Sequence, residues 1–71
     1  MDIQIKDMKL ILTISGNTLT RVVEDLDGNI IWSNGGEYYD NTMPSTLLDD
    51  YEAQMKQLPF WKIVEVEKNI E

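Results

Sequence analysis

The fold is decided by a stretch near the start of the chain, KLILTISGNTLTRVVE, which spans residues 9–24. Apolar and polar residues alternate on both sides of Gly16-Asn17, which is the pattern of two strands joined by a two-residue turn. The register set by this turn pairs three sets of residues on one face: Ile14 with Leu19, Leu12 with Arg21, and Leu10 with Val23. We therefore predict an antiparallel hairpin over these residues.

A third strand is predicted directly after this hairpin. Residues 25–29 read Asp-Leu-Asp-Gly-Asn, in which Asp27-Gly28 is a favoured pair for a type I′ turn, and an apolar run follows over residues 30–33. In that register Val23 lies opposite Trp32, and Glu24 lies opposite Ile31. The expected result is an antiparallel three-stranded meander, and we expect the glycines after residue 33 to end its last strand.

A helix and a final strand complete the predicted order β-β-β-α-β. Pro44 suits the first turn of a helix, and residues 45–57 carry an apolar stripe at spacings of three and four: Leu47, Leu48, Tyr51, Met55 and, just beyond, Leu58. Pro59 ends the helix, residues 60–67 form the last strand, and residues 68–71 are expected to fray. We predict one small α+β domain with the helix packed on one sheet face.

One helix covers only one face of a four-stranded sheet. Ile11, Val22, Ile31 and one apolar set of the last strand would then need other cover. Because the chain has no Cys, no disulfide can compensate for the small core expected of 71 residues. This combination favours either a homodimer or a protein partner.

The composition argues against catalysis. The chain has no His and no Cys, which removes the commonest general base, the commonest intracellular nucleophile and the best transition-metal ligands. Residues 25–29 resemble part of a calcium loop but lack its distant Glu and its flanking helices. We therefore expect no enzyme activity, no catalytic residue, no metal and no cofactor.

Charge restricts the partners. Thirteen Asp and Glu against six Lys and Arg give a net charge of −7, which repels nucleic acid and anionic lipid. The longest apolar run is far shorter than the roughly 20 residues that span a bilayer, and no signal peptide is evident, so we expect a cytoplasmic protein. No Lys or Arg interrupts the acidic residues of positions 24–52. We therefore expect this region to carry a concentrated negative potential. The alternative is that these acids serve only local roles, in loops and at the start of the helix.

The leading hypothesis is a binding protein for a basic partner. Tyrosine is enriched at protein contact surfaces, and two tyrosines lie between the acids of residues 37–40. The predicted contact residues are Glu37, Tyr38, Tyr39, Asp40, Asp49 and Asp50. In size, charge and lack of His and Cys, though in no motif, the chain resembles the small acidic antagonists that phages and mobile elements carry against host nucleases. That resemblance implies an inhibitor that occupies the basic groove of a nucleic-acid-handling enzyme.

Two alternatives of other classes stay open. The first is a homodimeric structural or assembly module, in which the uncovered sheet face forms the dimer and the acids provide solubility. The second is a protein that sequesters a small ligand, with Trp32, Trp61 and the tyrosines around a pocket at a subunit boundary.

Overall fold

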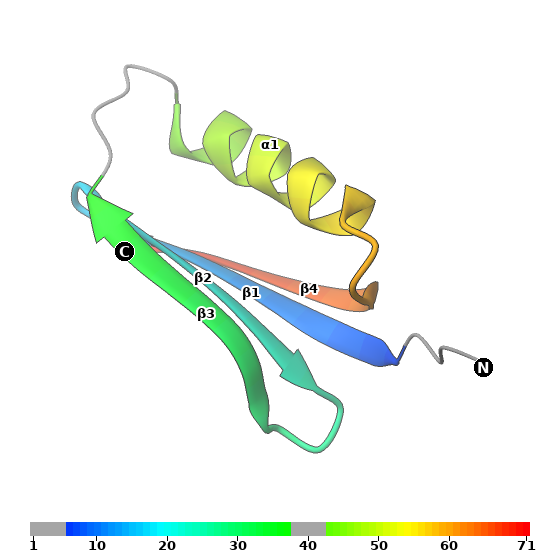
Figure 1. The fold of residues 1–71 in the computed structure, drawn as a ribbon. Coiled ribbons are helices and arrows are strands. Elements are labelled where there is room, and N and C mark those ends of the chain that lie inside the picture. Colours follow the sequence, from blue (N-terminus) through cyan, green and yellow to red (C-terminus); the bar gives the residue numbers. More distant parts are fainter. Residues whose placement is uncertain (1–5, 38–42) are drawn as a thin grey trace.

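The computed structural model describes residues 6–37 and 43–71, which form one mixed sheet and one helix (Figure 1). The elements are β1 (Asp7–Ser15), β2 (Thr18–Asp25), β3 (Ile30–Glu37), α1 (Pro44–Gln57) and β4 (Lys62–Ile70). The strand order is β3-β2-β1-β4, with antiparallel pairing except between β1 and β4, which are parallel. The α+β class is as predicted, but the sheet is mixed rather than purely antiparallel.

The hairpin of β1 and β2 has the predicted register. Leu12 pairs with Arg21 and Leu10 pairs with Val23. Gly16 has φ of 59°, whereas Asn17 has no positive φ. A positive φ at only the first turn residue is the requirement of a type II′ turn, which matches the twist of the two strands.

The turn between β2 and β3 differs from the predicted type I′ turn. Gly28 N donates to Asp25 O at 3.1 Å, and Gly28 itself has φ of 91°. The Asp25 carboxylate also accepts hydrogen bonds from the backbone N–H groups of Asp27 and Asn29, at 3.0 and 2.9 Å. The Asp25 side chain thus accepts hydrogen bonds from backbone N–H groups inside the loop. The loop has one residue more than the predicted two-residue turn.

The longer loop is accompanied by a bulge in β3. Val23 pairs with Trp32 as predicted, but Glu24 pairs with Ile30 instead of Ile31. The predicted end of β3 at Ser33 was also wrong, because the strand continues to Glu37. The first half of β2 thereby gains a hydrogen-bonded partner, and an edge strand tolerates glycine because few of its side chains pack.

The last strand begins and ends later than predicted. β4 runs from Lys62 to Ile70, so Phe60 precedes it. The predicted fraying of residues 68–71 was wrong, because Ile70 pairs with Ile14 and Glu71 N donates to Ile14 O at 2.7 Å. Parallel pairing along the whole of β1 therefore orders the end of the chain.

A bulge in β4 explains why both of its alternating sets begin apolar. Met8 pairs with Ile63 and the next residue of β1 pairs with Glu65, so Val64 is the extra residue. Ile63 and Val66 consequently both contact the core, and Val64 is 43% exposed. The bulge moves the acidic set of β4, and not an apolar set, to the face away from α1.

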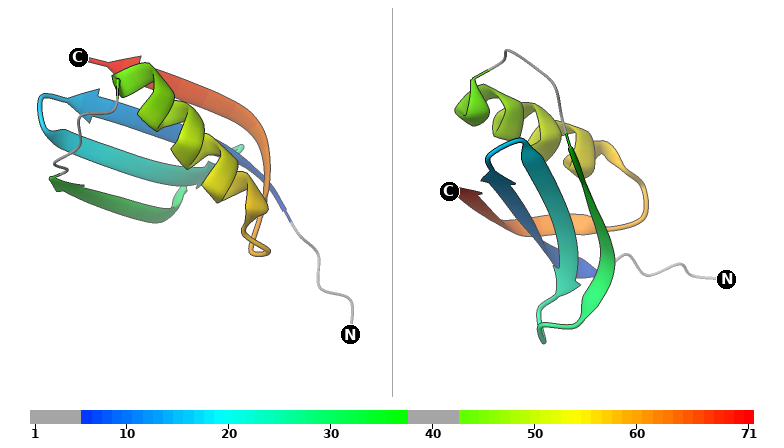
Figure 2. Two further views of the ribbon diagram at one scale, coloured as in Figure 1. Left: turned by 90° about the horizontal axis from the view of Figure 1, so that it is seen from above. Right: turned by 90° about the vertical axis from the view of Figure 1, so that its left-hand side faces the viewer.

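The core lies between the sheet and α1, which contacts β1 and β4 (Figure 2). Nine of the described apolar residues are buried there: Met8, Leu10, Leu12, Ile14, Leu19, Val23, Leu47, Leu48 and Met55. Trp32, which lies opposite the buried Val23, is only partly buried against this core. No helix within the described residues is long and apolar enough to cross a bilayer.

Candidate binding surfaces

The two predicted helix acids lie on different sides of α1. The helix begins at Pro44 without a side-chain cap and has no acid in its first turn, so neither Asp49 nor Asp50 lies at the positive end of the dipole. Successive helical residues point about 100° apart. Asp49 reaches β4, where Lys68 Nζ lies 2.7 Å from its Oδ1, whereas Asp50 is exposed to solvent.

Lys68 and Lys56 neutralise the acids on the β4 side of α1. Lys68 Nζ also lies 2.6 Å from Glu52 Oε1, and Lys56 Nζ lies 2.8 Å from Glu52 Oε2. Hydrogen bonds from Lys56 and then Lys68 lower the pKa of Glu52, while hydrogen bonds to Asp49 and then Glu52 raise the pKa of Lys68. These carboxylates already have cationic partners, which makes them poor contacts for a basic protein.

The structure describes only Glu37 among the other four predicted contact residues. Glu37 ends β3, and residues 38–40 lie outside the described residues. Asp25 is the last residue of β2, at the opposite end of the β2–β3 ribbon, and is separated from Glu37 by roughly 23 Å if a strand rises about 3.3 Å per residue. The acidic region of positions 24–52 is therefore continuous in sequence but divided in space.

The face of the sheet away from α1 carries acids that the sequence prediction did not select. We call it the uncovered face and define it by residues that alternate with buried ones: Lys9, Ile11, Thr13, Thr20, Val22, Glu24, Glu65, Glu67 and Asn69. Its central pair, Ile11 and Val22, is partly buried. Lys9 lies opposite Glu24 on β2 and opposite Glu65 on β4.

Hydrogen bonds order the β4 side of the uncovered face. Lys9 Nζ lies 3.4 Å from Glu67 Oε1, and Asn69 Nδ2 donates to Glu67 Oε2 at 3.0 Å and to Thr13 Oγ1 at 3.4 Å. The hydrogen bond from Asn69 and then the charge of Lys9 lower the pKa of Glu67. Glu67 is therefore held as a carboxylate on the surface.

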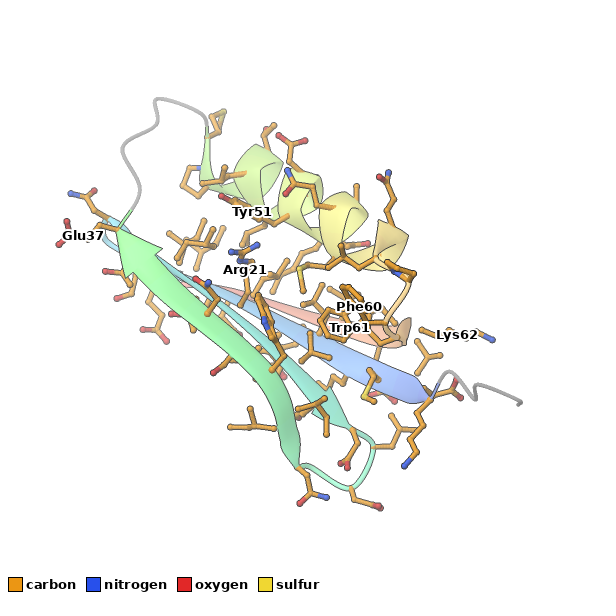
Figure 3. The ribbon with its side chains drawn as sticks, viewed as in Figure 1. Arg21, Glu37, Tyr51, Phe60, Trp61 and Lys62 are labelled. Atoms are coloured by element: carbon orange, nitrogen blue, oxygen red, sulfur yellow. The ribbon has the colours of Figure 1, made fainter. Side chains whose placement is uncertain are left out.

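A small pocket lies on the opposite face, beside α1. Figure 3 labels three of the residues that line it, Arg21, Glu37 and Tyr51. We call it the Arg21 pocket; its lining residues are Leu19, Arg21, Asn34, Gly36, Glu37 and Tyr51, and its cavity volume is about 110 Å³. The Arg21 guanidinium carbon lies 5.4 Å from the ring centre of Trp32 and 5.0 Å from that of Tyr51. Both distances fall in the range of cation–π attraction.

Trp61 is hydrogen-bonded to the last turns of α1. Its Nε1 donates to Met55 O at 3.1 Å, and its ring centre lies 5.9 Å from that of Trp32. The rings of the two tryptophans, which one of the alternatives places around a ligand, thus lie next to each other. Phe60, edge-on to Trp61, is 71% exposed beside them.

Sequence reasoning missed Arg21 and Tyr51, although a signal was present. The hairpin register places Arg21 on the same face as Leu19 and Val23, which is the face predicted to be buried. A cation on such a face needs aromatic or anionic neighbours. Asking which aromatic residues could reach it would have pointed to Trp32 and to the helix.

The described residues contain no group of three metal-ligating side chains. The sequence matches no protein-family model and no curated protein, and no solved structure matches the fold. Functional inference therefore depends on the surfaces described above.

Proposed function

We propose that this chain is a protein-binding domain that docks onto a basic protein through its uncovered face. The observation that carries the proposal is the chemistry of that face, where Ile11 and Val22 form an apolar centre. Three glutamates and one lysine lie around this centre: Glu24, Glu65, Glu67 and Lys9. An apolar centre within a charged rim is the usual arrangement of a protein–protein interface.

Electrostatics favour a basic partner over a neutral one. The net charge of −7 attracts a cationic protein from a distance, and rim carboxylates accelerate association and fix orientation. A protein whose basic groove binds nucleic acid fits this chemistry, because carboxylates can occupy the Lys and Arg side chains that otherwise hold phosphates. Binding of this kind weakens as salt concentration rises.

The helix side supports the proposal less well. Glu52 there is already bonded to Lys56 and Lys68, so a partner would have to displace existing ion pairs. The glutamates of the uncovered face outnumber its lysine, which leaves negative charge for a partner. We therefore place the contact on Glu24, Glu65 and Glu67 rather than on Asp49 and Asp50.

Two variants of equal net charge test this placement. The face variant, Glu24→Gln/Glu65→Gln/Glu67→Gln, removes three acids from the uncovered face. The control variant, Asp27→Asn/Asp49→Asn/Asp50→Asn, removes three exposed acids from the β2–β3 turn and α1. Each immobilised protein is used to capture proteins from a lysate of its source organism at stepped salt, and an identified basic protein is then titrated against all three forms.

The proposal predicts that the face variant binds this protein about tenfold more weakly, at about 0.2–1 kcal/mol for each exposed charge. The control variant should bind within about threefold of the original protein. Double-stranded DNA should compete if the contact is a nucleic-acid groove. Equal losses in both variants would show that net charge alone, and not the uncovered face, attracts the partner.

A further inference from the structure

Arg21 forms no ion pair with a carboxylate among the described residues. Lys9, Lys56 and Lys68 each lie within 3.4 Å of an acid, whereas the contacts of the Arg21 guanidinium in the described part of the chain are aromatic rings. This is unusual in a chain with thirteen acids. Its side chain is partly buried on the α1 side of β2, so water does not surround it freely.

The two rings prepare the guanidinium for binding. Trp32 on β3 and Tyr51 on α1 hold it from two elements, at 5.4 and 5.0 Å. A guanidinium stacked on rings keeps its N–H donors at its edge, where they match the two oxygens of a carboxylate. Because the rings already restrict the side chain, less conformational entropy is lost when a ligand binds.

The size of the Arg21 pocket limits its ligand to one functional group. A volume of about 110 Å³ holds roughly three or four waters at about 30 Å³ each. Pockets for whole small molecules are larger, at about 300–1,000 Å³. In the lining, Leu19 contributes an apolar side chain and Asn34 contributes an exposed side-chain amide. Gly36 has no side chain, so its exposed backbone can be approached closely.

The position of the pocket favours a side chain from an extended protein segment. β3 is an edge strand of the sheet, and Asn34 and Gly36 belong to it. A segment that pairs with a free edge sends alternate side chains to each face of the sheet. One such side chain would reach the α1 side, where Arg21 lies.

We propose that the Arg21 pocket accepts an Asp or Glu side chain from a partner segment that pairs with β3. The carboxylate would accept hydrogen bonds from the guanidinium of Arg21. Glu37 also lines the pocket and opposes a second negative charge, so the contact is expected to be weak and selective. The site is independent of the proposed function, because it lies on the other face of the sheet.

Two blocked peptides test the proposal: Ac-Thr-Val-Glu-Val-Thr-NH2 and its counterpart with Gln in place of Glu. Each is titrated into 15N-labelled protein while the amide signals of Asn34 and Gly36 are followed by NMR. The Glu peptide should shift both signals saturably and bind about tenfold more tightly than the Gln peptide, since only a carboxylate forms an ion pair with the guanidinium and accepts through two oxygens. Equal binding of the two peptides to the original protein would overturn the proposal.

Variants assign any selectivity to the pocket. Arg21→Met should abolish the preference for Glu, and Arg21→Lys should reduce it, because a lysine cannot bind both oxygens in the same plane. Glu37→Gln should strengthen binding of the Glu peptide a few-fold. The face variant should bind the Glu peptide at least as well as the original protein does, which separates this site from the uncovered face. Retained selectivity in a folded Arg21→Met protein would contradict the assignment.

Discussion

Lys9 Nζ lies 3.4 Å from Glu67 Oε1, across the parallel pair of β1 and β4. Glu24 and Glu65 flank the same lysine on the neighbouring strands. Lys9 is therefore the cation at the centre of the glutamates on the uncovered face. It offsets part of the charge that we propose attracts a basic protein, and its removal should have the opposite effect to removal of a glutamate.

Removal of the Lys9 charge should strengthen binding of a basic partner. Lys9→Gln should bind a basic partner roughly two- to fivefold more tightly, because it leaves the glutamates without a competing cation. The ion pair itself is exposed, so the free energy of unfolding should change by less than about 1 kcal/mol. Calorimetric titration and urea unfolding of the same variant measure both quantities. Weaker binding after this substitution would place the contact elsewhere.

The two faces of β1 should respond differently to truncation. Leu12 is fully buried, and Leu12→Ala should lower the free energy of unfolding by about 2–5 kcal/mol. Ile11 is only partly buried on the uncovered face, and Ile11→Ala should cost about 1 kcal/mol or less while weakening partner binding. Chemical denaturation gives the stability difference. Similar costs at both positions would mean that the uncovered face is buried in solution, as in a dimer.

Two glycines, Gly28 and Gly36, isolate the effect of backbone strain on stability. An added Cβ meets no atom within 4 Å at either Gly28 or Gly36, but only Gly28 has a positive φ, of 91°. Gly28→Ala should therefore lower the free energy of unfolding by about 1 kcal/mol or more, and Gly36→Ala should leave it nearly unchanged or raise it slightly. Thermal unfolding of the two variants checks this, and equal effects would contradict the turn geometry.

Acid should destabilise the protein through Glu52. Its hydrogen bonds to Lys56 and then Lys68 lower its pKa below the ordinary value of 4.5, so the folded state takes up this proton less readily than the unfolded state. The resulting stability is fully present above that value and is lost as pH falls below it, through the folded-state pKa. Glu52→Gln should show a smaller loss between pH 5 and pH 3 in urea unfolding. An unchanged pH dependence would mean that these ion pairs contribute nothing in solution.

Much of the fold could be predicted because its signals are local. The hairpin register follows from alternation around Gly16-Asn17, and α1 follows from an apolar stripe between Pro44 and Pro59. The turn at Asp25 and the bulge at Val64 could not be predicted so well. The first depends on a side chain that binds three donors of its own loop, and the second depends on pairing with a strand more than 50 residues away.

The candidate surfaces were harder to predict than the fold. Acids adjacent in sequence, such as Asp49 and Asp50, point in different directions on a helix, and Lys68 reaches Asp49 only because β4 lies under α1. The bulge at Val64 decides that Glu65 and Glu67 share the uncovered face with Lys9. Such surfaces depend on long-range pairing, which linear charge patterns do not contain.

The most direct measurement is an NMR titration of 15N-labelled protein with a decalysine peptide at low and at high salt. The account predicts saturable shifts in the amide signals of Lys9, Ile11, Glu65 and Glu67, which the face variant loses, the control variant keeps and high salt reverses. Shifts concentrated on Asp49, Asp50 and the rest of α1, or shifts that are equal in both variants, would contradict the claim that the uncovered face binds a basic protein.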